Sequence, residues 1–216
     1  MFTKTIITFI LIISTALSIQ IIGQNDYIGE IGISGGGAYY LGDANSIPFM
    51  NLQPAYGIFY RHRLDERFAL KFDLFKSTIV GGTTSFKNNI HNLDACYEFN
   101  FFDLEQNPYK RNTRKISTYI FAGLGIVNYQ YNGGQQFSTS IPFGVGIKIK
   151  LAERLNFNSH WTTRLVHTDK LEDVSSLSNP GGMNGSNFTN NDLHNTFTIG
   201  FSYDIFKNEC DCKDKK

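Results

Sequence analysis

The chain has 216 residues, a length that suits one domain or two small ones. Its formal net charge is +1, from 20 basic and 19 acidic residues, and this balance gives no support for nucleic-acid binding, which usually requires a strongly basic domain. Aromatic residues and glycine are abundant and proline is scarce, which favours β structure. The 3 cysteines provide no disulfide framework.

The first 23 residues have the pattern of a secretory signal peptide. Lys4 precedes a long apolar run, and Ala16 and Ser18 form a small-x-small cleavage site, with Gly23 as a second position. A membrane-anchor helix fits less well, because polar residues interrupt the run. We therefore expect residues 1–23 to be removed and the rest of the chain to be exported.

The remainder shows 8 segments in which apolar and polar residues alternate, as expected for β-strands. We place them at 27–41, 54–64, 67–78, 90–102, 116–131, 137–151, 154–166 and 193–206. Two connections, 64–67 and 151–154, are tight turns, and that at 132–136 is also short. The longest polar connection lies between 167 and 192.

The polar face of these segments is rich in small residues but carries charges of both signs. They are Glu30, Arg61, Lys71, Asp73, Asp94, Glu98, Lys148, Arg164 and Asp204. Pairable charges among small residues suit the inside of a narrow barrel, because a buried charge needs a partner. The apolar face is long and aromatic at its ends, like a lipid-facing band.

The sequence therefore predicts an all-β fold, an antiparallel up-and-down transmembrane β-barrel of 8 strands with a side-chain-filled lumen. We assign the barrel to residues 24–206 and a charged periplasmic tail to 207–216. An even strand number places both termini on one side, which would be the periplasm of a Gram-negative bacterium. The tight turns and the segment 103–115 then face the periplasm, and 167–192 lies outside.

Two further groups of residues have candidate roles. The segment 103–115 contains a basic run with Lys110, Arg111, Arg114 and Lys115. This run is either a solvated loop or a docking site for an acidic periplasmic partner. The last strand contains Gly200, Tyr203 and Ile205. Their pattern resembles the C-terminal insertion signal of bacterial outer-membrane barrels.

The glycine-rich stretch GISGGGAYYLGD, Gly32 to Asp43, raises the question of a phosphate-binding loop. Such a loop needs a following helix start with lysine, and neither is present here. Read as a strand, the stretch places Ser34 and Gly36 in the lumen and Tyr39 against lipid at the outer interface.

The sequence offers little catalytic or metal-binding chemistry, and we expect no enzyme activity, cofactor or metal. The histidines lack zinc-site spacing, and Cys210 and Cys212 fit a solvated tail. One alternative is a lipid-modifying or hydrolytic enzyme with a site at the extracellular rim, built from His167, Asp169, Ser175, Ser176 and His194. A soluble ligand carrier with an apolar interior is another alternative.

Four stretches, YIGEIGISGGGAYYLGD, STYIFAGLGIVNY, SIPFGVGIKIKLAERLNF and LVHTDKLEDVSS, resemble in this order the PorG-like outer-membrane barrels of the type IX secretion system. The resemblance implies a non-catalytic barrel that ties the outer membrane, with its lipid, to a periplasmic ring of a lipoprotein and its partner protein. The short connection at 132–136 and the Cys-Asp-Cys tail depart from the family pattern. These departures leave open an uncharacterised, porin-like barrel unrelated to secretion.

Overall fold

The structure is a computed structural model that describes residues 27–41, 49, 51–65, 67–80, 87–102, 115–131, 133–167 and 192–207. Its strands are β1 (Tyr27–Leu41), β2 (Gln53–Arg63), β3 (Phe68–Val80), β4 (Lys87–Asn100), β5 (Ile116–Tyr131), β6 (Gly134–Lys150), β7 (Leu155–Val166) and β8 (Asp192–Lys207). The predicted signal peptide and the tail beyond Lys207 lie outside the described residues. No helix long and apolar enough to cross a membrane is found in the part of the chain that the structure describes.

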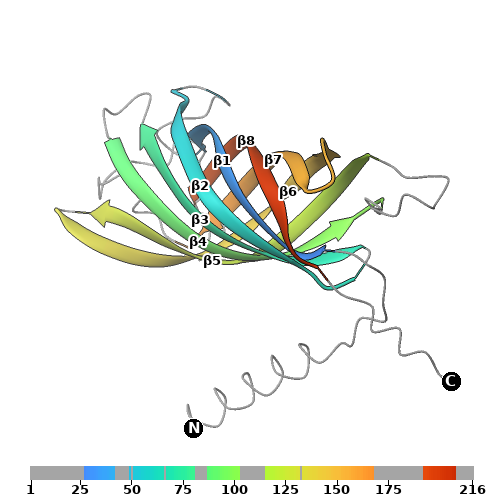
Figure 1. Ribbon diagram of the computed structural model, residues 1–216. Coiled ribbons are helices and arrows are strands. Elements are labelled where there is room, and N and C mark those ends of the chain that lie inside the picture. Colours follow the sequence, from blue (N-terminus) through green and yellow to red (C-terminus); the bar gives the residue numbers. More distant parts are fainter. Residues whose placement is uncertain are drawn as a thin grey trace, which may run out of the picture.

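The 8 strands form a closed barrel in which each strand pairs with its sequence neighbours and β8 pairs with β1 (Figure 1). All pairings are antiparallel, and the closing pair runs from Tyr27 opposite Lys207 to Leu41 opposite Leu193. We call the end of the barrel that carries Tyr27 and Lys207 the terminal end, and the opposite end the distal end. The predicted fold class is confirmed.

Residues alternate strictly between the two faces of the wall, and the apolar residues point outward. In β4, for example, exposed and buried residues alternate from Lys87 to Glu98. Large apolar side chains on the outer face are exposed, among them Ile31, Ile33, Leu74, Leu124, Val145 and Phe201. An apolar exterior around a polar interior is the arrangement of a membrane barrel and the reverse of the soluble-carrier alternative.

The predicted strands agree with the observed ones to within 3 residues at each end, with one difference that matters. The connection placed at 132–136 is shorter than predicted, since Tyr131 already pairs with Gly134. Two residues of an Asn-Gly sequence therefore join β5 and β6, and Gly133 has a φ of 76°. A two-residue hairpin favours Asn-Gly because its backbone requires positive φ.

The prediction that Tyr39 faces lipid is wrong, because a neighbouring segment covers its side chain. Tyr39 lies on the outer face of β1 yet is only 1% exposed. The ring of Phe49, from the connection between β1 and β2, lies 4.8 Å from the Tyr39 ring and 6.2 Å from that of Trp161. Leu52 sits over Gly37, where a β-carbon would come within 2.6 Å of it.

Candidate functional site

The lumen contains a buried ion-pair network centred on Arg61, near the terminal end. Arg61 Nη1 donates to Glu30 Oε1 at 2.6 Å, and Arg61 Nε donates to Glu98 Oε2 at 2.6 Å. Lys148 Nζ donates to the other Glu30 oxygen at 2.7 Å, and Ser202 also donates to Glu30. Arg61 is 2% exposed and Glu98 is 0% exposed, so these charges are stabilised by one another and not by bulk solvent.

The other predicted lumen charges form separate pairs along the lumen. Lys71 pairs with Asp73 at 2.7 Å, and Arg164 pairs with Asp94 at 2.8 Å. All nine predicted lumen charges are buried. They are Glu30, Arg61, Lys71, Asp73, Asp94, Glu98, Lys148, Arg164 and Asp204.

Sequence reasoning missed Lys150, which pairs with Asp204 at 2.5 Å. Its position follows Lys148 by two residues and therefore shares its face of β6, so the alternation rule contained the signal. Asn156 adds a hydrogen bond to the other oxygen of Asp204 at 2.8 Å. Asp204 is thus held by one partner from β7, its neighbouring strand, and one from β6.

Four aromatic rings in the lumen each lie against a glycine on the adjacent strand. Four aromatic residues are directly opposite a glycine in the strand register: Phe59 with Gly32, Phe75 with Gly57, Tyr119 with Gly146, and Phe121 with Gly144. A β-carbon at Gly32 would lie 2.4 Å from Phe59, and one at Gly146 would lie 2.3 Å from Tyr119. The glycines therefore provide the space that the rings occupy.

The same rings carry the lumen cations on their faces. The guanidinium of Arg61 lies 5.2 Å from the Phe59 ring centre and 5.5 Å from that of Tyr119. Lys71 Nζ lies 5.0 Å from Phe59, and the Arg164 guanidinium lies 5.3 Å from Phe75. Cation–π attraction is strongest where water is excluded, as it is at these buried cations. The glycines, aromatic rings, cations and carboxylates of the lumen therefore stabilise one another.

Toward the distal end the lumen contains a cluster of apolar side chains, beside buried polar ones such as Ser77 and Ser140. The buried cluster there consists of Ile79, Ile90, Val127, Tyr129 and Val166, with Tyr131 packed against it. These side chains and the charged groups nearer the terminal end together occupy the interior, which is narrow in a barrel of 8 strands.

Two residues of the rim-enzyme hypothesis, His167 and His194, lie within the described ranges, and they occupy different environments. His194 is 0% exposed, and its Nε2 lies 3.1 Å from Ser77 Oγ inside the barrel. His167 is exposed, just past the end of β7. Asp169, Ser175 and Ser176 lie outside the described residues. Within the described ranges, no group of three or more His, Cys, Asp or Glu residues is arranged to hold a metal.

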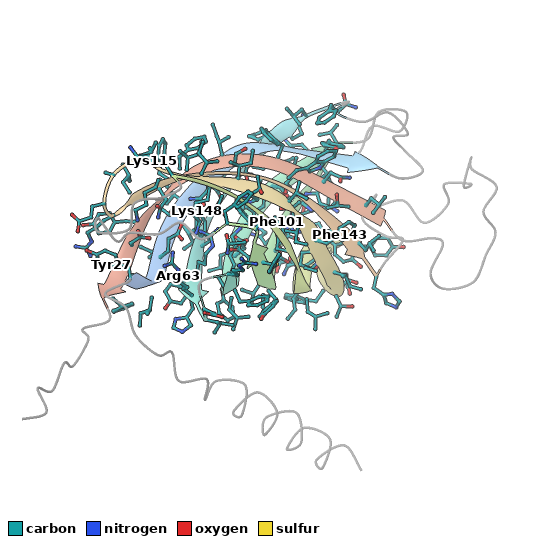
Figure 2. All side chains as sticks on the ribbon, turned by 90° about the vertical axis from the view of Figure 1, so that its right-hand side faces the viewer. Tyr27, Arg63, Phe101, Lys115, Phe143 and Lys148 are labelled. Carbon is teal, nitrogen blue, oxygen red and sulfur yellow. The ribbon has the colours of Figure 1, made fainter. Side chains whose placement is uncertain are left out.

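The mouth at the terminal end is a polar pocket above the Arg61 network. Its lining includes Tyr27, Arg63, Asn100 and Phe102 together with Glu30, Arg61, Lys148 and Asp204. Figure 2 shows Tyr27, Arg63 and Lys115 toward this end of the barrel. Lys115 is exposed, whereas the other predicted partner contacts, Lys110, Arg111 and Arg114, lie outside the described residues.

The residues of the predicted insertion signal lie in the last strand, β8. Tyr203 is exposed on the outer face, where its ring lies 4.5 Å from the Arg154 guanidinium. Ile205 is half-buried two residues further on. Gly200 is buried opposite Ser34, and a β-carbon there would lie 2.2 Å from the carbonyl oxygen of Ile33. Gly200 is therefore also required by the close approach of β1 and β8.

Comparison with solved structures supports the fold. Neisserial surface protein A (NspA) aligns with a TM-score of 0.55 and 13% identity, over 82% of this chain and 97% of NspA. Ail, the attachment invasion locus protein of Yersinia pestis, aligns with a TM-score of 0.46 and 13% identity, over 82% of this chain and 98% of Ail. At such identities the NspA likeness establishes the fold alone.

Sequence comparison provides a family assignment. No curated protein matches the chain. The family described as "Domain of unknown function (DUF6089)" matches residues 4–214, which include every strand of the barrel. The chain therefore belongs to the DUF6089 family, with the closed eight-stranded architecture of outer-membrane β-barrels.

Proposed function

We propose that this protein is a non-conducting structural component of the Gram-negative outer membrane that docks a periplasmic partner. The observation that carries this proposal is the filled lumen. Arg61 joins Glu30 and Glu98 across the interior, and an apolar cluster occupies the distal end. A barrel filled in this way acts through its surfaces and not through a passage.

The terminal end is the docking surface in this proposal, and it faces the periplasm. Its exposed positions include the cations Arg67 and Lys115. Lys115 is the last residue of the basic run 110–115. Cationic groups at a rim accelerate and orient the binding of an acidic partner. The motif order shared with PorG-like barrels supports a ring-forming lipoprotein and its companion in type IX secretion as that partner.

Site-specific photocrosslinking in cells tests the docking surface. A photoreactive amino acid replaces Lys115 at the terminal end or, as the matched control, Phe137, which is 70% exposed near the distal end. We expect residue 115 to capture a periplasmic ring protein and residue 137 to capture none. A second variant changes Lys110, Arg111 and Arg114 to glutamine and should weaken the capture at 115.

Two outcomes separate the parts of this proposal. Capture of a periplasmic protein that is not a secretion component would refute the type IX assignment and preserve docking. Equal labelling from both positions, or none from residue 115, would refute docking at the terminal end.

A further inference from the structure

The outward-facing side chains of the strands have a one-sided charge pattern. Among the described residues these positions include two lysines, Lys76 in β3 and Lys87 in β4, and no carboxylate. All Asp and Glu side chains that the structure describes within the strands point into the lumen, as the ion pairs described above illustrate. The two lysines lie on adjacent strands, so among the described side chains the lysines of the outer face are on one side of the barrel, toward the distal end.

Lys76 lies directly opposite His91 in the register of β3 and β4, and both side chains are exposed. Neither forms an ion pair with another described residue. Basic groups that face each other across two strands repel when both are charged. An anion placed between them would relieve this repulsion and gain two charge-assisted hydrogen bonds.

Two residues before Lys76 in β3, toward the middle of the barrel, Leu74 begins an apolar surface that continues across β2 and β1. Ile33 pairs with Ile58, and Ile58 pairs with Leu74, and each of the three is more than half exposed. These three residues line an open groove together with Tyr56, Lys76 and His91. Gly57 contributes to the floor of the groove without a side chain.

We propose that this groove binds a phosphate-bearing lipid from the leaflet at the distal end. The phosphate lies between Lys76 and His91, and an acyl chain follows Ile33, Ile58 and Leu74. A lipid is favoured over a soluble anion because the apolar row is part of the hydrocarbon-facing band. Cations at the edge of such a band meet the headgroups, where each contributes to anionic-lipid binding.

Native mass spectrometry of the intact barrel in detergent, titrated with phosphatidylglycerol, tests the proposal. We expect one phosphatidylglycerol to be retained in preference to phosphatidylcholine with the same acyl chains. The double variant Lys76→Gln, His91→Gln should weaken phosphatidylglycerol binding about fivefold or more, the effect of losing one or two headgroup cations. The control Arg67→Gln, Lys115→Gln removes two exposed cations from the terminal end and should leave binding unchanged.

The wild-type protein provides a second test that does not depend on folding of the variants. Millimolar inorganic phosphate should not displace the bound lipid, because phosphate lacks the acyl chain. Displacement by phosphate, equal retention of the two lipids, or undiminished binding by the folded double variant would each overturn the proposal. Loss of binding in the control variant would also overturn it, since the site would then lie at the terminal end.

Discussion

Replacing Arg61 with methionine should strongly destabilise the barrel, because it leaves Glu98 without a partner. Arg61 donates to Glu98 through Nε at 2.6 Å and Nη2 at 3.2 Å, whereas Glu30 keeps Lys148 at 2.7 Å. The Arg61–Glu98 attraction is about 4 kcal/mol for charges roughly 4 Å apart at an effective dielectric constant of about 20. Removing one member of a buried pair costs about 3–5 kcal/mol, and we expect a loss in this range.

The double variant Arg61→Met, Glu98→Gln separates charge from packing. Neutralising Glu98 removes the unpaired charge, so the double variant should recover about 2 kcal/mol or more relative to Arg61→Met. The free energy of unfolding is measured by guanidinium titration in lipid vesicles, and fluorescence from the single tryptophan, Trp161, reports the transition. Arg67→Met, in an exposed turn, should change stability by less than about 0.5 kcal/mol.

The reasoning is refuted if Arg61→Met is as stable as the wild type, or if the double variant is no more stable than Arg61→Met. The first result would mean that water solvates Glu98 in the lumen. The second would mean that the lost stability came from the volume and ring contacts of the guanidinium.

Three other predictions follow from the lumen and the last strand. Gly146→Val should destabilise the barrel by about 1–3 kcal/mol, because the new β-carbon would overlap Tyr119. Gly35→Ala should leave stability unchanged, because the nearest atom to its β-carbon would be 3.9 Å away. The guanidinium titration described above distinguishes the two variants. In planar lipid bilayers the purified barrel should carry no steady ion current, and a porin-sized current would contradict the filled lumen. Tyr203→Ala should reduce membrane assembly in cells but leave refolding in vesicles nearly unchanged; impaired refolding would instead assign Tyr203, which packs on Arg154, a structural role.

Much of the fold was predictable because alternation is a local property of a strand. Glu98 and Asp94 are separated by an even number of residues and must therefore share a face of β4, whatever the rest of the barrel does. The same rule places Lys148 and Lys150 on one face of β6. Strand assignment and the direction of each charge therefore required no tertiary information.

The partner of each charge required information that the sequence does not state. Arg61 reaches Glu30 on the neighbouring strand, but it also reaches Glu98 on β4, beyond β3. That second contact exists because the barrel is narrow enough for side chains to meet across its interior. Tyr39 illustrates the other limit, since alternation places it on the outer face without revealing that Phe49 covers it.

The contacts of Glu30 also constrain the order in which the barrel can assemble. Glu30 lies 118 residues from Lys148 and 172 from Ser202 along the chain, so these partners meet it only when β6, β7 and β8 have been added and β1 has closed against β8. Contacts between such distant residues form late and slowly. A slip of one residue between β1 and β8 would turn Ser202 outward and withdraw it from Glu30. The carboxylate of Glu30 thus makes ring closure cooperative and favours a single register over its neighbours.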